Sequence, residues 1–468
     1  MRRHERGALP VPARMCRVAV VAPASRLREA LVTVADSGSV ELAGTLPSPS
    51  GEAVEALRRV ERAGSAAPQP RLAPERPDTA ELERVGAADL LAGEVELERR
   101  AESAVRRGSF AALVGWTPQS DLDALSERLA PSGGVAVELP RPSWAEPPTL
   151  IAVKKLARPF RPLVETYGSA HYADVDPTLF TASSFVLMFG MMFGDVGHGL
   201  LVAALALLVR RGRGRLARFR AIWPLPFAAG LCAAFFGLLY GEAFGPTGLV
   251  PTLWLNPIDR PIPLLAAAVA IGAALLANGY AIGTVNRWRE QGAAAALVAP
   301  SGIAGSAIFL GGGIAAAGWY FESRLLGAVG GAIAVAGVIL LAVGSLIHAG
   351  RGALAGVEAS IEVLDSVVRI GGSVISFTRL AAFGLMHAAL SAIVWDGATA
   401  AWGGAVGTVL AVVVFVVGNS LAFALEALVA SIQALRLEYY ELFSRIFAGE
   451  GRPFSPWHIP LALERKPT

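Results

Sequence analysis

The apolar stretch PTLFTASSFVLMFGMMFGDVGHGLLVAALALLV, residues 177–209, decides the topology of this chain. A transmembrane helix needs about 20 apolar residues, so this stretch is too long for one crossing. A glycine-rich interruption, Gly-Asp-Val-Gly-His-Gly, divides it, and glycine tolerates the backbone of a tight turn. We therefore expect two crossings with an outward-facing turn formed by Gly194, Asp195, Gly197 and His198.

Six further apolar segments of transmembrane length follow this stretch. Hydrophobic residues make up 54% of the chain and charged residues 17%, and the charged residues concentrate before residue 165. This division predicts a soluble region followed by a membrane domain at 176–447. With the double crossing, eight spans are expected, the last six being 221–242, 262–285, 299–319, 325–347, 370–395 and 403–434.

Loop charge predicts the orientation of these spans. The loop RRGRGRLARFR, residues 210–220, is rich in arginine, and such short loops stay in the cytoplasm. Segments 243–261 and 396–402 are nearly free of basic residues and are expected outside. The first residues lack the apolar core of a signal peptide. We therefore predict that the N- and C-termini are cytoplasmic. Arginine far outnumbers lysine, which favours a prokaryotic source and so a location in the cell membrane of a prokaryote.

The soluble region, residues 16–165, reads as two similar α/β units. Strand, helix and strand patterns occur first at 17–23, 25–37 and 39–43, and again at 110–116, 120–129 and 134–139. Two helical segments between them, 52–63 and 79–107, predict a short helical hairpin. The predicted fold is an all-α bundle of eight transmembrane helices behind a small α/β N-terminal cytoplasmic domain with two βαβ-like lobes. Residues 1–15 and 448–468 are expected to form a disordered tail and a cytoplasmic C-terminal tail.

Composition and motifs exclude several classes of function. The formal net charge of +3 gives no reason to expect nucleic-acid binding. Cys16 and Cys232 are the two cysteines, which predicts neither a disulfide framework nor a metal cluster. No GxxxxGK[ST] phosphate loop occurs, so the chain is not expected to hydrolyse ATP, and no cofactor is predicted.

Two arginines lie within the last two predicted spans. Arg379 lies in ISFTRLAAFGLMH, residues 375–387, and Arg436 ends EALVASIQALR, residues 426–436. An arginine at the centre of a membrane helix costs about 2.5–3.5 kcal/mol on insertion scales, so each needs a reason. Snorkelling to the interface is the alternative, and it has more weight for Arg436 because charged residues soon follow it.

Other polar residues accompany these arginines. Helical spacing places Glu426, Gln433 and Arg436 on one stripe of the last span. His387 and Glu426 are expected on the outer side of the arginines, and Asp365 on the cytoplasmic side. This layout predicts two offset half-channels separated by a fixed positive charge, which attracts a carboxylate on a moving partner. For His387 and Glu426, a satisfied buried polar contact remains an alternative.

Three ordered motifs resemble subunit a, or I, of the V/A-type rotary ATPases. They are Asp176-Pro-Thr178 with FGMMFGDVGHG at 189–199, Ser376-Phe-Thr-Arg-Leu380 with His387, and 426–436 with FAGEGRPF at 447–454. The resemblance implies eight spans behind a cytoplasmic arm, which is short in this chain. Implied partners are a rotor ring of c/K subunits, peripheral stalks of E/G type, a soluble A/B catalytic head and the lipid bilayer. The family's two arginines, glutamate and histidine correspond to Arg379, Arg436, Glu426 and His387, and an acid of some members corresponds to Asp365.

The function that this resemblance implies is that of a stator subunit which does not itself hydrolyse ATP. It provides half-channels for H⁺ or Na⁺ beside the rotor and connects to the stalks. A secondary transporter is one alternative, although the internal repeats common in such folds are not found in 176–447. A paralogue that has lost coupling and serves another assembly is the other, supported by the short arm alone.

Overall fold

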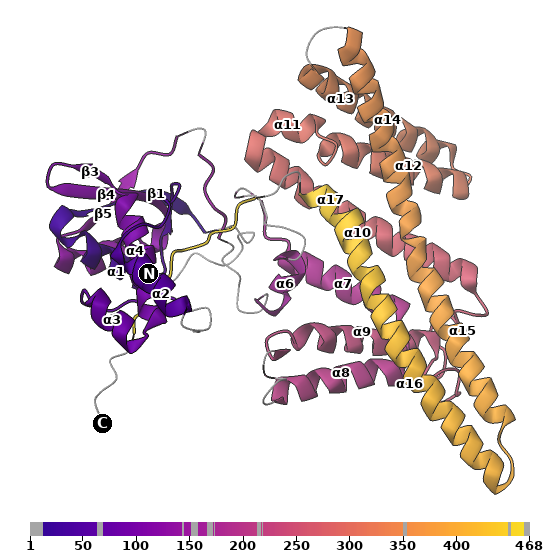
Figure 1. Cartoon of the computed structure of the whole chain (residues 1–468). Helices are drawn as coiled ribbons and strands as arrows, with labels where there is room; N and C mark the ends of the chain where they lie inside the picture. Colours follow the sequence, from indigo (N-terminus) through magenta and orange to yellow (C-terminus); the bar gives the residue numbers. More distant parts are fainter. Residues whose placement is uncertain are drawn as a thin grey trace. The chain divides into compact units, whose positions relative to one another are not determined.

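The computed structural model (Figure 1) describes most of the chain, and its elements form two compact units. One is an α/β unit, Pro12–Ala152 with Gly451–Thr468, and the other is a helical unit, Ala173–Glu450 with Val153–Ser169. The expected disordered tail, 1–15, lies outside the described residues except for its last three. The residues described are 13–62, 69–142, 145–150, 158–165, 172, 174–212, 217, 219–349, 353–447 and 451–462.

One antiparallel sheet forms the centre of the α/β unit. Its path is β2 (Glu41–Leu42), β4 (Phe110–Pro118), β1 (Met15–Pro23) and β5 (Val135–Leu139), with β3 (Val105–Arg107) also on β4. Apolar residues of β1 such as Val18 and Val20 are buried against helix α1 (Leu27–Ser37), which contributes Leu31 and Val34. Helix α5 (Leu122–Leu129) adds Leu125 and Leu129 to the same core.

The two predicted βαβ-like units are not separate lobes. β1 and β4 pair along their whole length, from Met15–Pro118 to Pro23–Phe110. β4 therefore lies between the two strands of the first unit, and β1 lies between those of the second. Each is a split βαβ unit, and the two interleave into one sheet. The prediction of two separate lobes was wrong. A sheet of two short strands has unpaired edges on both sides, and combining the strands of both units into one sheet reduces these edges.

The predicted helical hairpin exists, but its second arm is divided. Helix α2 (Glu52–Arg62) packs through Ala56 and Val60 on Leu91 of helix α4 (Ala88–Glu102). The segment expected as one helix, 79–107, breaks at Gly86, whose φ of 72° ends helix α3 (Thr79–Val85). Its last residues form β3, so the helix prediction was wrong there.

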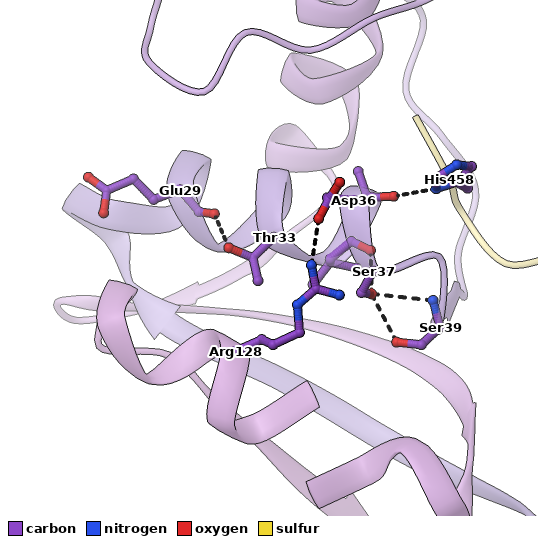
Figure 2. Close-up of polar contacts among 9 residues, drawn as sticks. Glu29, Thr33, Asp36, Ser37, Ser39, Arg128 and His458 are labelled. Atoms are coloured by element: carbon purple, nitrogen blue, oxygen red, sulfur yellow. Dashed lines mark hydrogen bonds and ion pairs between the residues drawn. The ribbon is translucent and has the colours of Figure 1, made fainter. Parts of the chain in front are cut away.

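The C-terminal residues belong to the α/β unit instead of forming a separate tail. Trp457 and Ile459 lie in the core of the sheet, 8% and 5% exposed. The Trp457 amide donates to the Val40 carbonyl at 2.8 Å, and the Ile459 amide donates to the Ala35 carbonyl at 3.3 Å. Figure 2 shows the His458 ring beside the end of α1, where Asp36 also pairs with Arg128. Residues 451–462 are thus an integral part of this domain.

The helical unit contains five helices, within the described residues, that are long and apolar enough to cross a membrane. They are Pro261–Gln291, Ala293–Tyr320, Arg324–Ile347, Gly356–Ala400 and Gly404–Ile446, so the chain is a multi-pass membrane protein. Shorter helices precede them: α6 (Arg161–Glu165), α7 (Thr178–Met192), α8 (Val196–Arg211) and α9 (Pro224–Tyr240). In finer detail the long ones comprise α10 (Pro261–Gln291), α11 (Ala293–Val298), α12 (Ile303–Tyr320), α13 (Arg324–Ala349), α14 (Ala353–Ser376), α15 (Thr378–Ala400), α16 (Gly404–Leu437) and α17 (Phe443–Ile446).

The glycine-rich interruption separates α7 from α8. The Asp195 carboxylate accepts the His198 amide at 2.8 Å and so caps α8. Gly194 and Gly197 let aromatic rings approach the turn, because an added Cβ would lie 2.5 Å from Tyr240 and 2.4 Å from Phe244. The Asp195 and His198 side chains, expected at the outer interface, are completely buried within the unit.

Candidate functional site

Arg379 follows a break in the longest helical segment. Phe377 separates α14 from α15, and its buried ring lies over Gly272 of α10, where an added Cβ would lie 2.2 Å from the ring. The local hydrogen bonds tighten at this point, with the Leu380 amide donating to the Phe377 carbonyl at 3.0 Å. A bulky side chain anchored in this way interrupts the regular helix. The break places Arg379 in the first turn of α15.

Arg436 lies just before a second irregularity. α16 passes into a π-helical turn, η6 (Glu438–Leu442), before α17. Glu438 turns inward here and accepts the Ser184 hydroxyl of α7 at 2.6 Å. Tyr440, two residues further on and so on the opposite side of the helix, is 72% exposed, whereas Glu438 is buried.

The two arginines meet in one groove of about 670 Å³. Arg379 is half-buried and Arg436 is exposed. Neither guanidinium has an ion-pair partner within 4.0 Å among the residues that the structure describes. The groove therefore carries two arginines and one acid, Glu441, so that positive charge is in excess. It is lined by Ser376, Arg379, Ile432, Leu435, Arg436, Tyr439, Tyr440 and Glu441.

A second, buried cluster lies deeper in the helical unit. The His387 ring on α15 hydrogen-bonds the Glu426 carboxylate on α16 through Nδ1, and both side chains are buried. The His198 ring lies edge-on to His387, with centroids 5.5 Å apart. Asp195 lies 3.8 Å from the His198 ring, and Glu242 is 2% exposed. The cluster thus withdraws three carboxyl groups and two imidazoles from solvent.

Several of these groups lack a hydrogen-bond partner among the described residues. Within 3.5 Å, this holds for Nε2 of His387, for one oxygen each of Glu242 and Glu426, and for both ring nitrogens of His198, whose polar neighbour is Asn419. A buried polar atom without a partner costs about 1–3 kcal/mol, and native proteins tolerate few. The concentration of such atoms around two imidazoles indicates a site adapted to bind protons, water or ions.

The predicted stripe on the last span divides between the two sites. Glu426 is buried against His387, whereas Arg436 is exposed and opens into the groove. The residues are ten apart, and at about 100° per residue the second is turned about 80° from the first. The expectation of one shared face was wrong for this reason. Gln433 lies between them in sequence, partly buried, with its Oε1 unpartnered among the described residues.

Asp365 is not joined to either site in the described structure. Its carboxylate pairs with Arg369 one turn along α14, and both side chains are more than half exposed. Sequence reasoning also missed two acids, Glu242 and Glu441. Glu242 lies in LLYGEAF, residues 238–244, directly after an apolar span. An ionisable side chain at the end of a membrane span is a functional candidate, and this signal could have identified Glu242.

Comparison with known proteins gives consistent matches. Residues 103–260 match the V-type ATPase 116kDa subunit family. The A-type ATP synthase subunit I of Thermococcus kodakarensis is 27% identical over 74% of this chain and 54% of its own length. The same subunit of Aeropyrum pernix is 29% identical over 76% of this chain and 58% of its own, and that of Archaeoglobus fulgidus is 32% identical over 38% and 30%.

The chain spans about half the length of the curated relatives it matches. The matched residues include the motif at 189–199, which forms the turn beside the buried cluster. The resemblance inferred from the membrane-domain motifs is confirmed: residues 103–260 match the V-type ATPase 116kDa subunit family, and about three quarters of the chain is similar to A-type ATP synthase subunit I proteins.

Proposed function

We propose that this protein is the membrane stator subunit of a V/A-type rotary ATPase and carries H⁺ or Na⁺ through two half-channels. Its rotor partner would be a ring of c/K subunits, connected through E/G-type peripheral stalks to an A/B catalytic head. The observation that carries the proposal is the groove in which Arg379 and Arg436 lie without an ion-pair partner among the described residues.

The surface that leads to this groove fits an apolar partner carrying an acid. Leu425, Leu428 and Ile432 are each more than half exposed and continue along α16 to Arg436. A helix of the rotor ring could pack on this surface and bring a carboxylate to the guanidiniums. Arginine remains charged at any accessible pH, so it favours the ionised carboxylate and blocks direct passage of cations.

The buried cluster supplies the outer half-channel in this proposal. Glu426 and His387 would exchange protons with the rotor acid, and Asp195, His198 and Glu242 extend the set of titratable groups away from the groove. The groove itself, with Glu441 and Ser376, would open the inner half-channel. Separation of the two sites by the arginines keeps an ion from crossing without rotation of the partner.

Eight spans with cytoplasmic termini are the topology that suits this proposal. Strand β1 and residues 451–462 pack in one α/β unit, which supports an even number of membrane crossings. Five long helices alone leave the two ends on opposite sides. Adding α7, α8 and α9 gives eight crossings and keeps the arginine-rich loop at 210–220 in the cytoplasm.

The test is ATP-driven ion uptake by the complete rotary complex in sealed vesicles. Arg379→Ala should abolish uptake, because the rotor acid loses its fixed countercharge. Arg369→Ala is the matched control, since this arginine lies on the preceding helix and is paired with Asp365. Co-purification of a c/K ring with both variants would establish that assembly is intact. Uptake by Arg379→Ala at the control rate, or ion transport by the isolated chain, would rule out the proposal.

A further inference from the structure

Asp195, His198 and His387 form a compact set of potential metal ligands. One ligating atom from each residue lies within 4.8 Å of the others, and all three residues are buried. The set combines residues from two parts of the chain, the N-terminal end of α8 with its cap residue and the middle of α15. Its two imidazoles and one carboxylate suit a borderline cation such as Zn²⁺ or Co²⁺ better than Mg²⁺ or Ca²⁺, which take oxygen ligands.

The ring nitrogens are available for such a bond. Neither nitrogen of His198 forms a hydrogen bond within 3.5 Å among the described residues, although its side chain is 0% exposed, and Asn419 is the polar neighbour of the ring. On His387, Nδ1 contacts Glu426 and Nε2 lacks a partner in the same part of the chain. A ligating histidine commonly donates its other ring N–H to a carboxylate, which fixes the tautomer and orients the ring. Glu426 already holds His387 in this manner.

The carboxylate is also positioned by its neighbours. Asp195 accepts the Gly245 amide at 2.9 Å through Oδ2 and the His198 amide at 2.8 Å through Oδ1. Each oxygen keeps a second lone pair for a metal. Tetrahedral zinc bonds of 2.0–2.1 Å place ligand atoms roughly 3.4 Å apart. Oδ1 of Asp195 and Nδ1 of His198 are 3.8 Å apart, so a small movement brings this pair into range.

Charge also favours a cation at this position. Asp195, Glu242 and Glu426 are all buried in this unit, and the two imidazoles are the bases beside them. Several buried carboxylates are costly unless they are protonated or neutralised. A divalent ion offsets two negative charges at once, whereas each proton offsets one.

We propose that Asp195, His198 and His387 bind a transition-metal ion of the Zn²⁺ class, and that the bound ion blocks ion flow past Glu426. Binding itself follows from the ligand set alone. The inhibitory consequence rests on the proposed function, because a divalent ion on Nε2 holds the His387 ring on Glu426 and places a fixed positive charge beside the proposed ion path. The site is then an inhibitory one within the outer half-channel.

Binding is tested on the purified full chain in detergent, freed of metal and titrated with Co²⁺. Tetrahedral Co²⁺ with nitrogen ligands absorbs in the visible range, and the band should saturate near one equivalent and disappear when Zn²⁺ is added. His198→Ala and Asp195→Asn should each lose the band, whereas His458→Ala, on the α/β unit, should keep it. Absence of the band from the unaltered chain, or its persistence in both site variants, would overturn the proposal.

A folding failure is distinguished by a second measurement. Tryptophan fluorescence and gel-filtration profiles must match between variants, and His198→Gln, which keeps a polar group in similar volume, should weaken Co²⁺ binding at least tenfold. Retained affinity in His198→Gln would also count against the site.

Inhibition is tested separately on the rotary complex in vesicles. Zn²⁺ is expected to reduce ATP-driven uptake of the unaltered complex at least tenfold, with reversal by a chelator. Uptake unaffected by saturating Zn²⁺ would refute the inhibitory role. If the complex does not transport ions at all, the proposed function fails while the Co²⁺ band still reports on the metal site.

Discussion

Replacement of His387 by leucine tests how the buried pair is stabilised. The His387 ring is 2% exposed and contacts Glu426, which is 5% exposed. His387→Leu removes this partner and leaves a carboxylate whose other oxygen already lacks one among the described residues. Removing one member of a buried pair costs about 3–5 kcal/mol, which is roughly a 10²–10⁴-fold change in the unfolding equilibrium.

The paired replacement provides the decisive comparison. His387→Leu with Glu426→Leu fills the site with apolar side chains, and such replacements are often neutral or stabilising by about 1–4 kcal/mol. We therefore expect the double variant to be more stable than either single variant. The assay is unfolding of the purified chain in mixed micelles by increasing SDS, followed by tryptophan fluorescence. Equal or additive losses in the double variant would refute an electrostatic origin of the coupling.

Three further predictions concern packing and pH. Gly237→Ala should destabilise the helical unit by about 1–3 kcal/mol in the same SDS assay, because the new Cβ would lie 2.3 Å from the Val196 nitrogen. The control Gly331→Ala, whose Cβ would have no atom within 4 Å, should leave the stability unchanged. Equal losses in the two variants would contradict this packing argument. Trp457→Ala should destabilise the α/β unit by about 3–5 kcal/mol, which limited proteolysis would detect as faster digestion of this unit. An unchanged digestion rate would show that residues 451–462 do not complete the core of the unit. Burial raises the pKa of Glu98 above its ordinary value of 4.5, and Glu94 adds to the effect, so the folded unit binds the proton more tightly than the unfolded chain. Stability of the folded unit is therefore lost as pH rises from 4.5 through the folded pKa of Glu98. Glu98→Gln should slow proteolysis at pH 8 but not at pH 4. An equal gain at both pH values would contradict this direction of the pH dependence.

Local sequence signals predicted the positions of most elements. Strand β1 and helix α1 were expected within a few residues of their bounds, and the glycine-rich interruption marked the end of α7. Such features depend on periodicity and turn chemistry, which act over a few neighbouring residues. The arginine pair was predicted from its cost in a membrane, and both members line one groove.

Contacts between distant segments were not predictable in the same way. The order of strands depends on which edges meet, and Met15 pairs with Pro118 across the intervening helices. The side chain of His198 was expected at a membrane interface, and its place beside His387 follows from the packing of α9 against the turn, where Gly237 allows close approach. Nothing in the pattern around Trp457 distinguished a core residue from a tail residue.

The place of residues 451–462 in the α/β unit affects how this protein is made. Trp457 and Ile459 complete a core whose first strand, β1, is synthesised before the whole membrane bundle. At about 5–20 residues per second, the ribosome needs roughly 20–90 s to bridge that interval. During this time the nascent domain has an open apolar face that chaperones and proteases can recognise. This core can therefore close only after every span has been synthesised.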